Sequence, residues 1–378
     1  MKTVGIICEY NPFHLGHSLQ LSSIREELNA RGEDACIVAL MSGSFVQRGG
    51  PAVLPKETRA AIALSEGTDL VLELPLPWCM SGADRFAAGA VAILEGLSGG
   101  IDYLAFGSET GDVDELERIA RVIGSPEFDK AVGNAAEARP DLSFAAQREM
   151  AYAELTDEPL PKLAPNDLLG VAYLSHMRTI RPLVFRRLPG YSATKARRAL
   201  QERDFAALQE LVPPATNDAL RASEGLSQDA MDHALIAHLL LTPTAVIATA
   251  AECNRELAAR LTDAAARSRT VAEVVEKATS KHYTAARVRR ALWHSYLGTP
   301  ANAPMGLPHY TNLLAANERG RAFLRTVAKK SEITIVTRPS NAAKDPQIAA
   351  EYAFSETRDR VWRLFAGIST EKKPPILK

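Results

Sequence analysis

The chain has 378 residues, of which 46% are hydrophobic and 24% are charged, and its formal net charge is -1. This composition is typical of a folded globular protein and excludes a disordered or fibrous chain. The length predicts about two or three domains, and the near-neutral charge by itself indicates no partner.

The cysteines and the hydropathy pattern predict a cytoplasmic protein. The four cysteines form no C-x-x-C pair, which argues against a zinc ribbon or a disulfide framework and favours a reducing compartment with the cysteines in the core. The first apolar run, residues 4–8, is too short for a signal peptide. The apolar residues 233–251 are interrupted by His238 and Pro243, so they predict a helix, a turn and another helix and no membrane span.

Two histidines lie between the first predicted strand and the first predicted helix. Residues 4–8, VGIIC, predict a strand, and apolar residues at helical spacing within 16–30 predict a helix, so His14 and His17 lie where that helix begins. The unpaired N–H groups of a helix amino terminus attract phosphate, and Gly16 lets a phosphate approach closely. Imidazole N–H groups add donors toward charge that develops as a phosphate bond breaks. The alternative, two unrelated surface or capping histidines, does not explain their position.

Strand and helix patterns then alternate in the first half of the chain, in the stretches DACIVALMSG, KETRAAIALSEG, DLVLELP, ADRFAAGAVAILEGL, DYLAFGSE and VDELERIARVIG. This alternation predicts an α/β fold with a Rossmann-like parallel sheet and helices on both faces. Ligands of such sheets bind beyond the carboxyl ends of the strands. The polar loops 11–17, 42–50 and 107–109 all follow predicted strands.

The loop from Ser42 to Gly50 is predicted to be mobile and to close over the reaction centre, because it combines polar side chains with two glycines. A plain surface loop is the alternative.

A second phosphate-binding helix start is predicted within LPGYSATKARRAL. Ser192 can cap a helix whose first turn holds Thr194, and Lys195, Arg197 and Arg198 follow. Hydroxyls, helix N–H groups and cations at one helix start would hold a polyphosphate. An ordinary cap on a solvated basic helix is the alternative.

Helical patterns dominate after residue 200. We therefore expect a boundary there, with residues 1–200 as the sheet domain and 201–378 as a mainly helical domain that returns one strand near 332–337. The tail from residue 370 is expected to fray.

Basic stretches predict a nucleic-acid partner. Residues 168–201 and 277–317 contain no Asp or Glu, and a helix beginning near residue 284 would place Arg287, Arg290 and His294 on one face away from the core. Such a face suits an RNA backbone, although a solvated helix face is the alternative. The residues expected to serve RNA binding are Lys281, Arg287 and Arg290, with Tyr283 and Trp293 nearby for base stacking.

The H-x-G-H motif after the first strand and the later Ser-x-Thr-x-x-Arg helix start resemble the nucleotidyltransferase superfamily. Over residues 1 to about 200 the chain is similar, more narrowly, to the tRNA(Met) cytidine acetate ligase family, in GIICEYNPFHLGH, MSGSFVQRGGPAVLPKETRAAIAL, DLVLELP, FGSE, PNDLLGVAYL and SATKAR. The stretch KHYTAARVRRALWHSYLG resembles that family's carboxy-terminal helical region.

This resemblance implies a nucleotidyltransferase domain followed by a mainly helical tRNA-binding domain. It implies an enzyme that converts ATP and acetate into acetyl-adenylate and pyrophosphate, and then acetylates N4 of the wobble cytidine of elongator tRNA(Met). ATP is then a substrate, accompanied by Mg²⁺, and the remaining partners are acetate and tRNA. Attack on an α-phosphate needs positioning and charge neutralisation more than a protein nucleophile, which fits the lack of a Ser-His-Asp or Cys-His pattern.

The resemblance also implies the site residues. His14 and His17 would be catalytic and face the phosphates, and no protein metal ligand is expected. The ATP-binding residues would be Ile7, Cys8, Glu9, Tyr10, Asn11, Pro12, Phe13, His14, Leu15, Gly16, His17, Ser18, Leu19, Gln20, Gly107, Asn166, Arg187, Leu188, Ser192 and Thr194. Singly, a turn glycine, a helix cap, a surface arginine or a core leucine explains each later position equally well.

Two other functions remain open. A small-molecule adenylyltransferase of the same superfamily would use both phosphate motifs but would leave the basic helical region without a role. A nonenzymatic tRNA-binding protein with a nucleotide-binding fold would be marked by loss of His14 or His17, and both residues are present.

Overall fold

A computed structural model describes residues 1–187, 190–302, 306–371 and 373–378. The elements of the amino-terminal part are β1 (Lys2–Cys8), α1 (Leu15–Ala30), β2 (Ala35–Ser42), β3 (Phe45–Val46), β4 (Gly50–Pro51), α2 (Lys56–Ser65), β5 (Leu70–Leu74), the short 3-10 helix η1 (Trp78–Met80), α3 (Ala83–Glu95), β6 (Tyr103–Ser108), α4 (Val113–Ile123), α5 (Pro126–Ala138), α6 (Phe144–Thr156), α7 (Pro165–His176) and β7 (Arg181–Arg186).

The carboxy-terminal part is mainly helical but also supplies strands. Its elements are α8 (Ala193–Gln201), α9 (Phe205–Gln209), α10 (Pro214–Ala222), α11 (Gln228–Leu241), α12 (Thr244–Ile247), α13 (Arg255–Ala265), α14 (Val271–Ala278), α15 (Ala285–Tyr296), β8 (Tyr310–Ala316), α16 (Glu318–Val327), β9 (Thr334–Val336), α17 (Pro339–Ala342), α18 (Pro346–Phe365) and β10 (Ile376–Leu377).

The central sheet confirms the predicted α/β class. In the described residues its strand order is β10-β8-β5-β2-β1-β6-β7, with β9 paired to β8. Strands β5, β2, β1, β6 and β7 run parallel to one another, and β8 runs antiparallel to β5. The chain order reverses at β1, which lies between β2 and β6, and such a switch point is where a doubly wound sheet binds its ligand.

Strand β2 explains why both faces of this sheet are covered. All of its residues are buried. Because successive side chains point to opposite faces, Cys36, Val38 and Leu40 join one hydrophobic core, whereas Ile37 and Met41 join the other. The strand therefore reads as a continuous apolar run, which is typical of parallel sheets.

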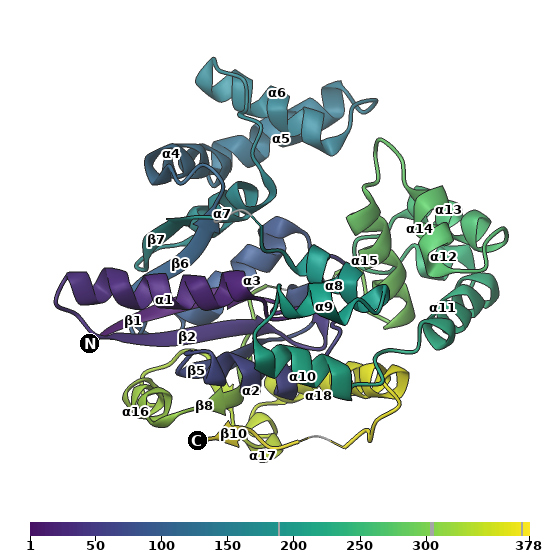
Figure 1. The fold of residues 1–378 in the computed structure, drawn as a ribbon. Helices are drawn as coiled ribbons and strands as arrows, with labels where there is room; N and C mark the ends of the chain where they lie inside the picture. The colour runs from purple at the N-terminus through teal and green to yellow at the C-terminus, as the bar shows by residue number, and fades with distance from the viewer. Residues whose placement is uncertain (188–189, 303–305, 372) are drawn as a thin grey trace.

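Helices cover the two faces of the sheet in separate layers (Figure 1). Helices α1, α2, α8, α9 and α10 pack on one face, and α3, α4, α7 and α16 pack on the opposite face. Helices α11 to α15 form a lobe beside the sheet, and α5 and α6 pair beyond α4. The lobe and the α4 to α7 region stand on either side of the carboxyl ends of β1 and β6.

The last part of the chain returns to the sheet. Strand β9 lies inside the range 332–337 where a returning strand was expected, whereas β8 was not predicted. Ile376 and Leu377 form β10 against β8, so the prediction of a frayed tail is wrong for these residues. Backbone pairing with β8 satisfies donors and acceptors that a frayed tail would leave to water.

No helix of the described residues is long and apolar enough to cross a membrane. Residues 233–251 form α11 and α12 with a break at Pro243, as predicted. Cys36 and Cys79 are buried as expected, and Cys8 and Cys253 are partly buried side chains that pack against the edges of the two hydrophobic cores.

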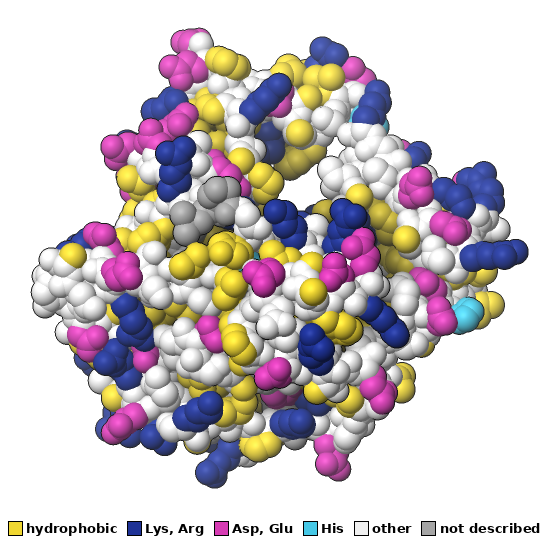
Figure 2. Space-filling view, viewed as in Figure 1, with side chains coloured by type: hydrophobic (Ala, Val, Ile, Leu, Met, Phe, Trp, Pro, Cys, Tyr) yellow, Lys and Arg dark blue, Asp and Glu magenta, His cyan; other side chains and the backbone are white. Residues whose placement is uncertain are grey.

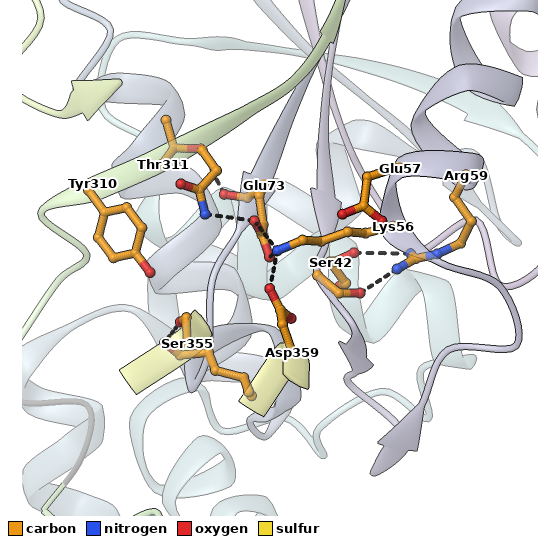
Figure 3. A network of polar contacts seen from close by, with 12 residues as sticks. Ser42, Lys56, Glu57, Arg59, Glu73, Tyr310, Thr311, Ser355 and Asp359 are labelled. Atoms are coloured by element: carbon orange, nitrogen blue, oxygen red, sulfur yellow. Dashed lines mark hydrogen bonds and ion pairs between the residues drawn. The ribbon is translucent and has the colours of Figure 1, made fainter. Parts of the chain in front are cut away.

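A buried polar cluster joins the carboxy-terminal helix to the sheet (Figure 3). The Lys56 ammonium group donates to both carboxylate oxygens of Glu73, each at 2.9 Å, and also to Asp359 of α18. Asn312 of β8 donates to Glu73 Oε2 at 2.8 Å. We call Lys56, Glu73, Asn312 and Asp359 the Lys56 cluster. Its members come from α2, β5, β8 and α18, so it fixes segments that are far apart in the sequence.

Candidate active site

A cavity of about 770 Å³ opens at the carboxyl ends of β1, β6 and β7. Its walls come from β1, the first turns of α1, the β3–β4 hairpin, α3, α7 and α15. Figure 2 shows a hollow at this place, between the α4 to α7 region and the α11 to α15 lobe, with Lys and Arg side chains on its rim. We call it the central cavity.

His14 and His17 form a stacked pair in the wall of the central cavity. Their ring centroids are 3.6 Å apart with an interplanar angle of 14°. His14 is the N-cap residue of α1, and its backbone N–H donates to Nδ1 of His17 at 3.1 Å. Because Nδ1 of His17 accepts a hydrogen bond, the neutral ring carries its proton on Nε2. Sequence analysis predicted both the helix start and the pair.

Both rings are neutral at physiological pH. Burial and the nearby Arg187 charge lower the pKa of His14 to about 4, and burial and His14 lower the pKa of His17 well below its usual value. The residue His14 is 6% exposed, and its side-chain Nδ1 has no hydrogen-bond partner among the described residues. Neutral imidazoles act as hydrogen-bond donors toward an anion and do not neutralise its charge.

The loop between β1 and α1 is held in a strained conformation. Tyr10 has a φ of 46°, which is unusual for a residue with a side chain, and it is buried against Phe13 and His17 at ring distances of 4.6 and 4.9 Å. The packing of these rings offsets the strain and fixes the direction in which His17 points.

Two arginines hold the backbone around this loop. The buried Arg59 of α2 donates to the carbonyl oxygens of Glu9 at 2.6 Å and Ser42 at 3.0 Å, and also to that of Gly43. Arg197 of α8 donates to the carbonyl oxygen of Asn11 at 2.6 Å. These bonds fix the ends of β1 and β2 relative to α2 and α8. Sequence analysis did not find a role for Arg59, because nothing local distinguishes it from a surface arginine.

Arg187 and Asn166 meet on Glu109. Arg187 Nη1 donates to Glu109 Oε1 at 3.2 Å, the Asn166 side-chain amide donates to the same oxygen, and the Asn166 backbone N–H donates to Oε2 at 3.1 Å. A Cβ on Gly107 would lie 3.0 Å from Cγ of Arg187, so this glycine makes room for the arginine. The two predicted ATP contacts therefore share one wall.

The start of α8 borders the central cavity through Tyr191 and Ala193. Ser192 caps the helix as predicted, accepting from the Lys195 backbone N–H at 3.2 Å. Thr194 accepts from Arg197 at 3.3 Å. Neither Ser192 nor Thr194 is among the residues that line the central cavity.

The β3–β4 hairpin is anchored and does not form a free loop. Gly49 has a φ of 83°, and a Cβ there would lie 2.6 Å from the backbone nitrogen of Arg290 in α15. Phe45 packs on Trp293 with ring centroids 5.5 Å apart. The expectation of a mobile loop is therefore wrong for the hairpin, although Gln47 and Arg48 at its tip do line the central cavity.

Helix α15 does not present the basic face expected from the sequence. His294 is fully buried, and its Nε2 lies 2.9 Å from the Met80 carbonyl oxygen. The Arg290 side chain is 11% exposed and pairs with Glu252 at 3.1 Å. Arg287 donates to the Glu252 carbonyl oxygen at 3.3 Å. Tyr283 and Trp293 are buried, so the idea that they stack on bases is wrong; the helix instead packs against η1 and the hairpin.

The predicted site residues divide into two groups. Those that line the central cavity are Ile7, Cys8, Glu9, Tyr10, Asn11, His14, Gly16, His17, Leu19, Gln20, Gly107, Asn166, Arg187 and, from the RNA-binding set, Arg290. Those that do not line it are Pro12, Phe13, Leu15, Ser18, Ser192, Thr194, Lys281 and Arg287. Leu188 lies outside the described residues. Phe13 is instead a core residue, and Ser18 donates to Glu66 at 2.7 Å.

The cavity walls also contain residues that sequence analysis did not place there. An apolar section is formed by Phe86, Phe106, Leu163, Leu168, Leu169, Tyr173 and Phe185, and the cations are Arg48, Arg186, Arg187, Arg289 and Arg290. Glu9 is the one carboxylate among the described lining residues. This distribution suits a ligand with an apolar or aromatic part and several negative charges. The run of basic residues near position 287 could have indicated that Arg289 belongs to the site.

No group of three or more His, Cys, Asp or Glu side chains that could hold a metal ion occurs in the described part of the chain. The lining residues therefore fit a metal ion only as a companion of a polyphosphate, whose oxygens would be its ligands.

Known proteins resemble this chain over nearly its whole length. The family described as HIGH Nucleotidyl Transferase matches residues 1–373. The tRNA(Met) cytidine acetate ligase of Syntrophotalea carbinolica is 34% identical over 363 residues, which cover 89% of this chain and 85% of that protein. The protein of the same name from Caldanaerobacter subterraneus subsp. tengcongensis is 33% identical, covering 89% of each. Thermotoga maritima TmcAL bound with alpha-thio ATP has a TM-score of 0.89 and 27% identity, covering 100% of this chain and 99% of that chain.

Proposed function

The chain belongs to the tRNA(Met) cytidine acetate ligase family, within the HIGH nucleotidyl transferases, and from this premise we propose its reaction. It uses ATP to activate acetate as acetyl-adenylate, releases pyrophosphate, and then acetylates N4 of the wobble cytidine of elongator tRNA(Met), leaving AMP. The observation that carries this proposal is the stacked, neutral pair of His14 and His17 at a helix start inside a cavity lined by arginines. Because elongator tRNA is a cytoplasmic substrate, we propose that the enzyme acts in the cytoplasm.

The first half-reaction needs the α-phosphate of ATP next to a bound carboxylate. The amino terminus of α1 offers N–H groups for the phosphates. His14 and His17 add ring N–H donors, and Arg187 adds a positive charge in the wall of the same cavity. As the acetate oxygen attacks phosphorus and pyrophosphate leaves, these groups stabilise charge that grows on the phosphate oxygens. Mg²⁺ would arrive with ATP on its phosphate oxygens and supply further charge neutralisation.

The adenosine part of ATP fits the part of the wall beyond Arg187, where apolar residues line the cavity. Asn166 presents an amide near the start of α7, and Phe106 and Leu169 offer apolar surface for a base. The contacts predicted at Ile7 to Gln20, Gly107 and Arg187 remain part of the proposal for the positions that line the central cavity. Ser192 and Thr194 would act indirectly, by fixing the start of α8.

The tRNA would approach from the side of the α11 to α15 lobe. Residues 1–200 would build the adenylate and residues 201–378 would hold the RNA, as the sequence predicted. Arg289 of α15 and Lys195 of α8 are exposed cations, and Arg48 stands at the hairpin tip near Arg289. Lys281 and Arg287 stay predicted RNA contacts, whereas the pairing of Arg290 supports a different role.

Isotope exchange tests the activation step. The protein should catalyse acetate-dependent exchange of labelled pyrophosphate into ATP, with tRNA present or absent. Exchange that depends on a mononucleotide or a phosphopantetheine-like substrate and not on acetate would favour the small-molecule adenylyltransferase instead.

Mass spectrometry tests the transfer step. With ATP and acetate, and without acetyl-coenzyme A, elongator tRNA(Met) should gain one acetyl group on one cytidine after nuclease digestion. Unmodified tRNA in a preparation that performs the exchange would limit the proposal to acetate activation. A protein that binds tRNA but performs neither step would be the nonenzymatic alternative.

A further inference from the structure

The two half-reactions of the proposed function differ in their use of protons. When acetate attacks the α-phosphate, a carboxylate oxygen bonds to phosphorus and pyrophosphate leaves, and no proton moves. When the cytidine N4 amine attacks the acetyl carbon, a C–N bond forms, the C–O bond to AMP breaks, and the amine must lose one proton. An acceptor near the acetyl group therefore accelerates only the second half-reaction.

Few groups of the central cavity can accept that proton. His14 and His17 are poor bases, because their pKa values lie far below the usual value for histidine. Burial raises the pKa of the Cys8 thiol and of the Tyr173 hydroxyl, so both stay protonated. A guanidinium group is a cation with donors only, so the arginines cannot accept a proton. This leaves Glu9, the one carboxylate among the described lining residues.

Glu9 is held with one carboxylate oxygen occupied and the other available. Its Oε1 accepts from the Gln47 backbone N–H at 2.8 Å, and its carbonyl oxygen accepts from Arg59 at 2.6 Å. Among the described residues no donor reaches Oε2. Burial raises the pKa of this carboxyl, and the hydrogen bond from Gln47 and the charges of Arg48 and Arg197 offset the shift only partly. A half-buried carboxylate with one free oxygen is suited to take a proton.

A chain of contacts from the α11 to α15 lobe supports this arrangement. Arg290 Nη1 donates to the Gln47 carbonyl oxygen at 3.3 Å, and Nη2 donates to Glu252 at 3.1 Å. The other oxygen of Glu252 accepts from the Gly82 backbone N–H at 2.8 Å. Glu252 has a φ of 62°, which is costly for a residue with a side chain, so the surrounding contacts hold it in place. The lobe thereby fixes Gln47, and Gln47 fixes Glu9.

We infer that Glu9 is the proton acceptor of acetyl transfer and that Arg290 is a positioning residue that acts through Gln47. The inference rests on the proposed function. In the step, the N4 nitrogen bonds to the acetyl carbon, the electron pair of the broken C–O bond leaves with AMP, and the proton passes from N4 to Oε2 of Glu9 and then to water.

Glu9→Gln separates this role from ATP binding. The amide oxygen of glutamine can still accept from Gln47, so the loop keeps its anchor. Glu9 also lines the proposed ATP site, so acetate-dependent pyrophosphate exchange is measured beside transfer and should fall much less than transfer does. Transfer to elongator tRNA(Met), measured in a single turnover from enzyme preloaded with ATP and acetate, should fall by about 10²-fold or more.

Each outcome has one meaning. Unchanged transfer by E9Q would overturn the inference, and so would an equal loss of exchange and transfer, which would place Glu9 in ATP binding. Failure of the wild type to perform the exchange would instead overturn the proposed function, and exchange without acetylation of tRNA would overturn its transfer step. Glu26→Gln, which removes an exposed carboxylate of α1, is the control and should change neither rate.

The pH dependence of transfer gives a second test. The wild-type rate should fall as pH drops through the raised pKa of Glu9, because only the carboxylate accepts a proton, and E9Q should lack this fall. The groups that face Glu9 are Arg48 of the hairpin, Arg59 of α2, Arg197 of α8, Tyr173 of α7 and Cys8 of β1. Burial raises the pKa of Cys8 and of Tyr173 away from the acid range, and guanidinium groups are cations throughout it. His14, whose pKa is about 4, is common to both proteins.

Arg290→Lys tests the positioning role. Lysine keeps the positive charge but cannot bridge Gln47 and Glu252 with two nitrogens. The kcat of transfer should fall by about tenfold with little change in the KM for tRNA. A rise in the KM for tRNA with unchanged kcat would show that Arg290 is an RNA contact, as the sequence first predicted.

Discussion

The Lys56 cluster and the central cavity both place charged groups inside the protein, but they satisfy them differently. In the Lys56 cluster, one ammonium group meets two carboxylates, and the Lys56 side chain is 3% exposed. A smaller cavity of about 280 Å³ beside it is lined by further opposite charges, such as Arg363 and Glu57, which pair with each other. Among the arginines of the central cavity, Arg187 pairs with Glu109 and Arg290 pairs with Glu252, whereas Arg48, Arg186 and Arg289 form no ion pair with the described residues. A buried nitrogen of His14 likewise has no hydrogen-bond partner in the described residues.

The difference teaches how to tell a structural cluster from a binding site. Buried polar groups are normally paired within the protein, because an unpaired one costs roughly 1–3 kcal/mol. A cluster that meets this requirement internally stabilises the fold and leaves little for a ligand to do. The wall of the central cavity holds cations and an imidazole nitrogen that lack partners within the protein. A bound anion would provide those partners. The following predictions test that distinction, from the largest expected effect to the smallest.

Lys56→Met should lower the free energy of unfolding by roughly 3–5 kcal/mol, because Glu73 and Asp359 would remain buried without their cation. Urea unfolding measures this loss. Lys329→Met, at an exposed position, is the control and should change stability by less than about 0.5 kcal/mol. A Lys56→Met protein as stable as the wild type would mean that the cluster is not structural. The folded fraction should still perform pyrophosphate exchange at a normal rate.

His17→Ala should lower activity and leave stability nearly unchanged. Loss of a donor aimed at the α-phosphate should lower the rate of acetate-dependent pyrophosphate exchange by about 10²-fold, or about 2.7 kcal/mol, while the unfolding transition and tRNA binding change little. His233→Ala, an exposed histidine of α11, is the matched control. Normal exchange by a folded His17→Ala protein would remove His17 from the catalytic machinery.

Stability should fall in mild acid. The pKa values of His14 and His294 are both lowered to about 4, so between about pH 6.5 and 4 the unfolded chain binds protons that the folded chain excludes. Stability is therefore highest above pH 6.5 and is lost as pH falls, by up to about 1.4 kcal/mol per pH unit for each histidine. Urea unfolding at several pH values measures how the free energy of unfolding changes with pH. His294→Gln should reduce this change by the contribution of one histidine. An unaltered slope would mean that His294 is protonated in the folded protein.

Arg289→Gln should weaken tRNA binding only a few fold, and should reduce the salt dependence of binding by about one unit of log K against log salt concentration, because one exposed cation gives about one phosphate contact. Arg287→Gln should have a smaller effect, since its guanidinium already contacts the Glu252 carbonyl oxygen and the ring of Tyr283 at 5.2 Å. Equal effects of the two substitutions on tRNA binding would support the basic RNA-binding face that was predicted from the sequence.

Local patterns in the sequence were enough to predict the sheet core and the first wall of the site. Apolar runs separated by amphipathic helices gave β1, β2, β5 and β6 with their crossover helices, because side-chain periodicity is a property of neighbouring residues. The H-x-G-H motif placed His14 and His17 at the start of α1, and Ser192 was found as a cap for the same reason. The resemblance of these motifs to a known family supplied the reaction.

Only the tertiary structure decided which charged side chains are already paired within the protein and which can contact a ligand. Lys56 and Asp359 are 303 positions apart, and Arg290 and Gln47 are 243 apart, so no local pattern shows that these cations are already occupied. The same holds for β8 and β10, whose pairing depends on an edge of the sheet that only forms when the chain returns to it. Sequence fixes where a side chain lies along its own element, whereas burial and pairing, which set its pKa and its availability to a ligand, depend on the elements that pack around it.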